Sequence, residues 1–139
     1  METKNMKYTD LKDMLYKSGE AYGERPAYVF KTEEGEFRTI THKEFREQIN
    51  SLGTALIHMG LKDKRIAVIS ENRYEWGVAY LAIATGTGVV VPLDKALPDN
   101  EIESLIIRSE VEAIFYSSKY DNIMKKIKEE NNKQVKYFI

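Results

Sequence analysis

The sequence contains no cysteine among its 139 residues. Disulfides, thiolate metal sites and a cysteine nucleophile are therefore excluded. No sign of charge dominates either, since 21 Lys and Arg residues stand against 22 Asp and Glu residues. That balance argues against a nucleic-acid-binding surface driven by bulk charge.

Long apolar runs are also missing. No stretch approaches the roughly 18 consecutive apolar residues that a transmembrane helix needs. The amino-terminal stretch METKNMKYTDLKDMLYK has no apolar core of the signal-peptide type. We therefore expect a cytoplasmic protein without a transmembrane segment. The length suggests one domain, which buries roughly 70% of the surface of its unfolded chain and needs no covalent staple.

What is present first predicts a helix and a hairpin. Apolar residues recur at helical spacing over residues 10–22, and Asp10 is placed to cap the helix. Residues 26–40, PAYVFKTEEGEFRTI, have the alternation and the central turn of a β-hairpin. Gly35 is free to take the positive φ that such a turn requires.

A second helix is predicted from residue 41 onward. Thr41 and Glu44 form a capping box, and Ile40 and Phe45 are placed for a hydrophobic staple. One apolar stripe follows at steps of four and three residues, and it consists of Phe45, Ile49, Leu52, Leu56 and Met59. Gly60 supplies the left-handed residue that ends the helix.

The remaining chain alternates short apolar runs with helical patterns. The runs RIAVIS and GVVVPL predict buried strands at 65–70 and 88–93. The runs EAIFYS and QVKYFI predict a third and a fourth strand at 112–117 and 134–139. The intervening helices are expected from a cap at Asn72 to Glu75, from Pro98, and from a cap at Ser117 or Ser118. Strand–helix–strand repetition predicts an α/β fold with a parallel sheet and right-handed crossovers.

Gly86 and Gly88 raise the possibility of a phosphate loop, but their position argues against it. A phosphate loop leaves a strand, turns on glycines and enters a helix, whose amino-terminal N–H groups then face the anion. Here the glycines follow a helix and precede a strand, and position 91 is Val where a third glycine would stand. We interpret Gly86 as a helix end and Gly88 as the start of a strand.

Other groups of polar or aromatic residues do not indicate a chemical reaction. The groups considered are the histidines His42 and His58, the acidic residues Glu71, Glu75 and Asp94, and the helix residues Trp76, Tyr80 and Leu81. The histidines lack metal-ligand spacing, Glu75 is interpreted as a helix cap and Asp94 as a turn residue, and core packing is favoured for the three helix residues. The loops available to a ligand are those after the strands, at 70–73, 92–100 and 117–120.

Several ordered segments resemble the amino-terminal region of AMP-forming acyl-CoA synthetases, the adenylate-forming ligases. They are GEFRTITHKEF, LGTALIHMGLKDKRIAVISENRYEW and AIATGTGVVVPLDKALPDNEIESLIIRSE. The form SENR followed by EW resembles the long-chain fatty acid branch. Two departures are His42, where the family usually has Tyr, and the turn Lys62 to Arg65, where the family has a glycine two residues before the arginine.

The resemblance implies a parent enzyme that joins a carboxylic acid, of the fatty acid class, to ATP. The acyl-adenylate then passes its acyl group to coenzyme A, and the parent uses Mg²⁺. In this family the phosphate loop, the nucleotide motifs and the catalytic lysine all lie further on. We therefore assign no catalytic, cofactor-binding or metal-binding residue to this chain, and we expect it to be inactive alone.

The resemblance further implies one partial domain over residues 1–139, the amino-terminal subdomain of a ligase. Its expected parts are a helix, a hairpin and a capped helix at 8–60 and parallel βα repeats at 65–139. The expected partners are the rest of its own polypeptide and, by open sheet edges, further copies of itself. Two alternatives stay open: a small nucleotide- or flavin-binding domain, and a non-enzymatic interaction module.

Overall fold

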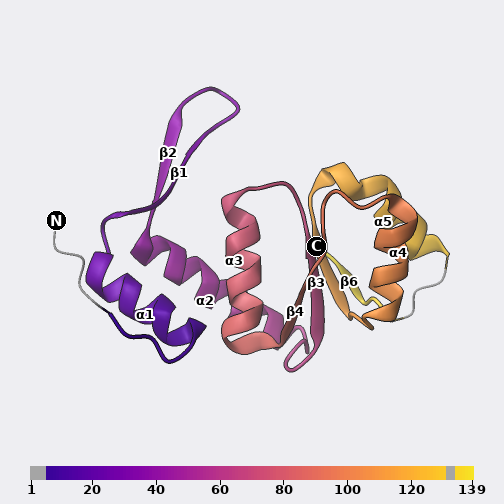
Figure 1. Ribbon diagram of the computed structural model, residues 1–139, viewed down its shortest axis with the longest axis horizontal. Helices are drawn as coiled ribbons and strands as arrows, with labels where there is room; N and C mark the ends of the chain where they lie inside the picture. The colour runs from indigo at the N-terminus through magenta and orange to yellow at the C-terminus, as the bar shows by residue number, and fades with distance from the viewer. Residues whose placement is uncertain (1–5, 131–133) are drawn as a thin grey trace. The chain divides into compact units, whose positions relative to one another are not determined.

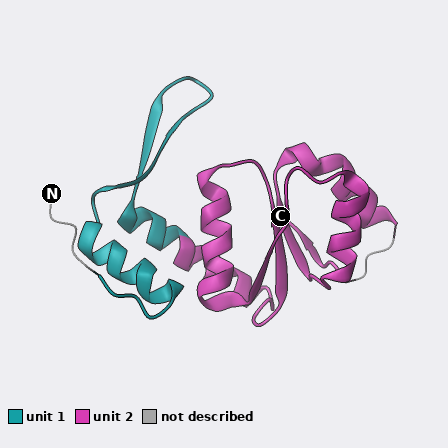
Figure 2. Ribbon diagram, in the orientation of Figure 1, with its two compact units in different colours: residues 1–48 teal, residues 49–139 magenta. Residues whose placement is uncertain are grey.

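A computed structural model describes residues 6–130 and 134–139. The chain forms two compact units, residues 1–48 and residues 49–139 (Figure 2). Residues 1–5, which begin the segment without a signal-peptide core, lie outside the described residues. No described helix is long and apolar enough to cross a membrane. The division of the chain into domains stays a prediction.

The first unit opens with helix α1, Leu11–Tyr22. The predicted cap is confirmed, because the backbone N–H of Asp13 donates to the Asp10 carboxylate at 2.7 Å. Strands β1, Pro26–Lys31, and β2, Phe37–Thr41, form an antiparallel hairpin. Gly35 has a φ of +88° in the connecting turn, as predicted.

Helix α2, His42–His58, begins with the predicted capping box. The Glu44 N–H donates to Thr41 Oγ1 at 3.1 Å, and the Thr41 N–H donates to Glu44 Oε2 at 2.8 Å. These bonds lower the pKa of the Glu44 carboxyl, with the backbone N–H of Thr41 as the main cause. Gly60 follows the helix with a φ of +80°, which confirms the predicted left-handed residue.

The second unit contains a parallel four-stranded sheet with the order β4-β3-β5-β6. The strands are β3 Arg65–Ile69, β4 Val89–Pro92, β5 Ala113–Tyr116 and β6 Tyr137–Phe138. The helices are α3 Tyr74–Ala82, α4 Asp99–Arg108 and α5 Asp121–Glu129. Helix α3 lies on one face of the sheet, and α4 and α5 lie on the other (Figure 1). The expected α/β architecture is confirmed.

Alternation along β3 builds a separate core on each face of the sheet. Ile66 and Val68 join a cluster with α3 and the residues around the end of α2. Ala67 and Ile69 join the larger cluster with α4 and α5. All four side chains are almost fully buried, as expected for a central strand with helices on both faces.

The strand β4 corrects the prediction of a buried strand at 88–93. Val89 is 55% exposed and the next two valines are half-buried. The physical reason is topology, because β4 pairs only with β3 and lies at one edge of the described sheet. An apolar run does not reveal whether its strand lies at the centre or the edge.

Two predicted helix caps are also wrong. The residue at the N-cap of α3 is Arg73, which makes no side-chain cap bond, while the Asn72 oxygen accepts from Lys95 Nζ at 3.0 Å. Ser117 precedes a 3₁₀ turn at Ser118–Tyr120, again without a side-chain cap bond, and α5 starts only at Asp121. Both predicted capping side chains lie instead at the carboxyl end of the sheet.

Candidate functional site

The three loops that sequence reasoning left available to a ligand meet at the carboxyl end of the sheet. Lys95, from the loop after β4, donates to Asn72 in the loop after β3 at 3.0 Å. The hydroxyl of Tyr120, which follows β5, donates to the Lys95 carbonyl at 3.2 Å. Burial of the Tyr120 phenol raises its pKa, with smaller contributions from Glu71 and Asp94. Hydrogen bonds therefore hold the three loops together at this end of the sheet.

The connections reverse direction between β3 and β5. The chain passes from β3 through α3 outward to β4, and from β5 through α5 outward to β6. The carboxyl ends of β3 and β5 are paired, and because α3 and α5 cover opposite faces, the chain leaves these two ends toward opposite faces of the sheet (Figure 1). Ligands in open parallel sheets bind at this kind of switch point.

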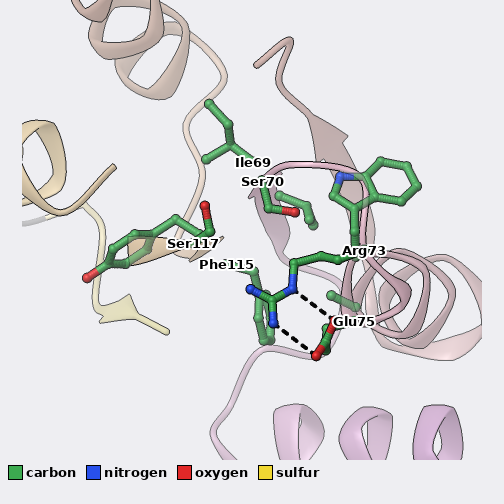
Figure 3. Close-up of a pocket in the computed structure, with 10 residues that line it drawn as sticks. Ile69, Ser70, Arg73, Glu75, Phe115 and Ser117 are labelled. Carbon is green, nitrogen blue, oxygen red and sulfur yellow. Dashed lines mark hydrogen bonds and ion pairs between the residues drawn. The ribbon is translucent and has the colours of Figure 1, made fainter. Parts of the chain in front are cut away.

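A cavity of about 140 Å³ lies at this switch point (Figure 3). Its lining comes from β3, α3, β5 and the loops that follow the two strands; it consists of Val68, Ile69, Ser70, Arg73, Glu75, Trp76, Ala79, Phe115, Tyr116 and Ser117. Val68, Ile69 and Ala79 are buried, and the rings of Trp76 and Phe115 are half-buried. The walls are therefore mainly apolar.

An ion pair marks the exposed side of the cavity. Arg73 Nε and Nη2 donate to the two carboxylate oxygens of Glu75 at 2.9 and 3.0 Å, as the dashed lines in Figure 3 show. This carboxylate raises the pKa of the Arg73 guanidinium above its ordinary value. The side chains are about half exposed, so the two charges compensate each other while remaining in contact with water.

Two serines contribute the remaining polar groups. Ser70 donates its hydroxyl proton to the Glu71 carbonyl at 2.9 Å. Ser117 is 9% exposed, and its side-chain oxygen has no hydrogen-bond partner among the described residues. The hydroxyl does lower the pKa of the nearby Glu71 carboxyl, but their contact falls outside hydrogen-bond geometry. A contact of this kind lowers a carboxyl pKa without satisfying the hydrogen-bonding capacity of the buried hydroxyl.

The residues weighed from the sequence fall into three groups. Among the described residues, no three His, Asp or Glu side chains gather to hold a metal, so Glu71, Glu75 and Asp94 do not form an acidic site. His42 contacts the Tyr22 ring at 5.6 Å between centroids. Trp76 stacks on Tyr80 at 5.0 Å, packs against a core and also lines the cavity.

The glycine pair has a structural role. A Cβ on Gly88 would overlap the Lys64 carbonyl oxygen, because β3 and the start of β4 approach closely there. The Gly86 carbonyl accepts a hydrogen bond from Lys62 Nζ at 3.0 Å. Neither backbone is arranged as a phosphate loop.

The cavity does not fit a nucleotide. Pockets for drug-sized ligands measure roughly 300–1,000 Å³, and this one measures about 140 Å³. Its guanidinium is already engaged by Glu75 and is not available as an independent phosphate ligand. This cavity is therefore not an ATP site, and no chemical step is assigned to it.

Sequence reasoning missed the cavity itself. The sequence did not indicate that Arg73, Phe115 and Ser117 line one cavity, and they become neighbours only because β5 pairs with β3. The signal available in the sequence was that polar residues follow both β3 and β5. The pairing of these two strands then brings those residues together.

Comparison with known proteins agrees with the fold. The model of a protein family described as "AMP-binding enzyme" matches residues 15–138. The chain belongs to the AMP-binding enzyme family. Fatty acyl-CoA synthetase A of Dictyostelium discoideum is 33% identical over 86 residues, which cover 61% of this chain and 13% of that protein. Long-chain-fatty-acid–CoA ligase 5 of Rattus norvegicus is 28% identical over 92 residues, which cover 64% of this chain and 14% of that protein.

Solved structures of such enzymes show the same fold. The N-terminal domain of FACL13 from Mycobacterium tuberculosis superposes with a TM-score of 0.81 at 20% identity, covering 96% of this chain and 34% of that one. The anthranilate CoA ligase AuaEII, in complex with anthranoyl-AMP, superposes with a TM-score of 0.81 at 16% identity. The match covers 99% of this chain and 26% of that one. This AMP-binding family member thus spans only a small part of its relatives' length, and neither alternative function is favoured.

Proposed function

We propose that the chain is the amino-terminal scaffold of an acyl-CoA synthetase. In the full-length enzyme, a carboxylic acid of the fatty acid class reacts with ATP to give an acyl-adenylate and pyrophosphate. Coenzyme A then takes the acyl group, and Mg²⁺ accompanies the nucleotide. The observation that carries this proposal is the family match over residues 15–138.

The relatives support the choice of substrate. Proteins named fatty acyl-CoA synthetase A and long-chain-fatty-acid–CoA ligase 5 are 33% and 28% identical to this chain over their matched segments. The chain spans only 13% and 14% of these two relatives. The absence of a phosphate-loop motif from the sequence agrees with a division of labour, in which later segments of the polypeptide handle ATP.

An ATP–pyrophosphate exchange assay tests the proposal. The 139-residue chain is incubated with ATP, magnesium, labelled pyrophosphate and fatty acids of several lengths, beside the polypeptide encoded by its full open reading frame. We expect exchange by the longer polypeptide only, dependent on added fatty acid. Exchange by the 139-residue chain would overturn the scaffold role, and a longer polypeptide inactive with every carboxylic acid would overturn the assigned reaction.

The described surface also supports association between copies of the isolated chain. The edge strand β4 carries the exposed Val89, and Phe37 of the hairpin is 78% exposed. Open edges and apolar patches pair with other chains. We expect light scattering to show a mass that rises with protein concentration, whereas a monomer mass at every concentration would contradict this expectation.

A further inference from the structure

The cavity between β3 and β5 has the size of a single six-membered ring. An engineered apolar cavity of about 150 Å³ is known to bind benzene, and this cavity measures about 140 Å³. Val68 and Ala79 supply buried apolar walls, and the rings of Trp76 and Phe115 supply half-buried ones. A ring bound here would exchange contacts with water for contacts with these four side chains.

The Ser117 hydroxyl points to a ligand that carries an oxygen. Ser117 lines the cavity, is nine-tenths buried and has no hydrogen-bond partner among the described residues. Most buried hydroxyls in native proteins are paired, and an unpaired one is costly. A ligand hydroxyl would supply both a donor and an acceptor for this group.

The charges around the cavity favour a neutral ligand. An anion would meet the carboxylates of Glu75 and Glu71, and a cation would meet Arg73. Arg73 uses Nε and Nη2 for Glu75, and its third guanidinium nitrogen, Nη1, points away from Glu75 in Figure 3. It adds a second donor for a neutral oxygen at the exposed side of the cavity.

We propose that this cavity binds a neutral single-ring compound with one hydroxyl group, of the phenol type, whose oxygen pairs with Ser117. The site is separate from the proposed activation of a fatty acid, because a long acyl chain and a nucleotide both exceed its volume. Its occupancy can therefore be tested without any enzyme activity.

The test is a titration of the ¹⁵N-labelled chain with phenol, followed by NMR. Toluene is titrated in parallel, because it replaces the hydroxyl of phenol with a methyl group of similar size. We expect saturable shifts confined to the amides around Ile69, Ser70, Phe115 and Ser117, with phenol binding more tightly than toluene. An absence of saturable shifts in this region would overturn the proposal.

Two variants separate the hydroxyl from the cavity. Ser117→Ala should weaken phenol roughly fivefold, as expected for one hydrogen bond, and leave toluene unchanged. Ser118→Ala is the matched control, because Ser118 is exposed and lies outside the lining. Ala79→Leu fills the cavity and should abolish binding of both compounds, whereas the exposed Ala96→Leu should not.

Each comparison has a contrary outcome. Equal affinity for phenol and toluene in the parent chain, or a phenol affinity unchanged by Ser117→Ala, would remove the role of Ser117. If Ala79→Leu does not fold, the comparison of phenol affinity between the parent chain and Ser117→Ala still decides whether the ligand pairs with Ser117. Binding that survives in folded Ala79→Leu would place the ligand elsewhere and overturn the site.

Discussion

The two ends of the parallel sheet differ in how their polar side chains are paired. At the amino end, Glu112 lies between two lysines, with Lys136 at 2.6 Å and Lys64 at 2.9 Å, and Arg65 binds Glu110 at 2.6 Å. At the carboxyl end there are a cavity, an exposed ion pair and the buried Ser117 hydroxyl without a partner. The amino end pairs its charged side chains between strands, whereas the carboxyl end leaves the Ser117 hydroxyl without a partner among the described residues.

The turn before β3, at residues 62–65, is also held by a hydrogen bond at the amino end of the sheet. Asp63 takes a φ of +60° at the place where the family resemblance leads one to expect a glycine. Its N–H donates to the Thr87 carbonyl at 2.7 Å, so the turn keeps its shape without the glycine. Aspartate is among the few residues that tolerate this left-handed conformation. The departure from the family pattern therefore leaves the connection to β3 intact.

The largest effect is expected from Gly88→Ala at the amino end. Its new Cβ would overlap the Lys64 carbonyl oxygen, and both atoms belong to backbone that neighbouring strands hold in place. We expect a loss of about 2–3 kcal/mol in the free energy of unfolding, measured by urea titration. Gly86→Ala is the matched control, since no atom lies within 4 Å of its added Cβ. Equal losses in both variants would contradict the close approach of β3 and β4.

A smaller effect is expected from Glu112→Gln, and it should depend on pH. Lys136, followed by Lys64, lowers the pKa of the Glu112 carboxyl from its ordinary value of 4.5. The folded state therefore favours the ionised form, and the stabilisation is present above pH 4.5 and lost as the pH falls through the lowered pKa.

Urea titrations of both proteins at several pH values measure this difference. The parent should be more stable than Glu112→Gln at neutral pH, and the gap should close in acid and shrink with added salt. Glu110→Gln, which breaks a more exposed pair, should show a smaller gap. A gap that is independent of pH would mean that the carboxylate charge contributes nothing.

The smallest effect is expected from Ser117→Ala at the carboxyl end. The lost hydroxyl has no partner in the described part of the chain, so its removal should leave the free energy of unfolding within about 0.5 kcal/mol or raise it. The same urea titrations measure it beside Ser118→Ala. A loss well beyond that range would show that Ser117 is paired in the folded protein, and the contrast between the two ends would fail.

Local features were predicted well from the sequence, and nonlocal ones were not. The cap at Asp10 and the capping box at Thr41 and Glu44 were confirmed, because their partners lie three residues apart. The cap at Asn72 failed because Lys95, 23 residues away, binds that side chain. The capping role of Ser117 failed in the same region of the sheet.

The candidate site was predicted only in outline. That the loops after the strands gather at one edge follows from a parallel sheet, whatever the strand order. The cavity depends on β5 pairing with β3 rather than β4, and the edge position of β4 follows from the same order. Strand order depends on long-range packing that no short motif records.

The central claim is that this chain is the scaffold part of an adenylate-forming ligase, with ATP handled by later segments. Sequencing the gene past the codon for Ile139 tests it most directly. We predict an open reading frame of several hundred codons, with a segment like T-S-G-T-T-G-x-P-K-G within a few tens of residues, roughly a quarter of a domain. Such a loop supplies glycines for close approach, hydroxyls and N–H groups for the phosphates, and a lysine for charge. A stop codon directly after Ile139, or a continuation without a loop rich in Ser, Thr and Gly, would contradict the claim.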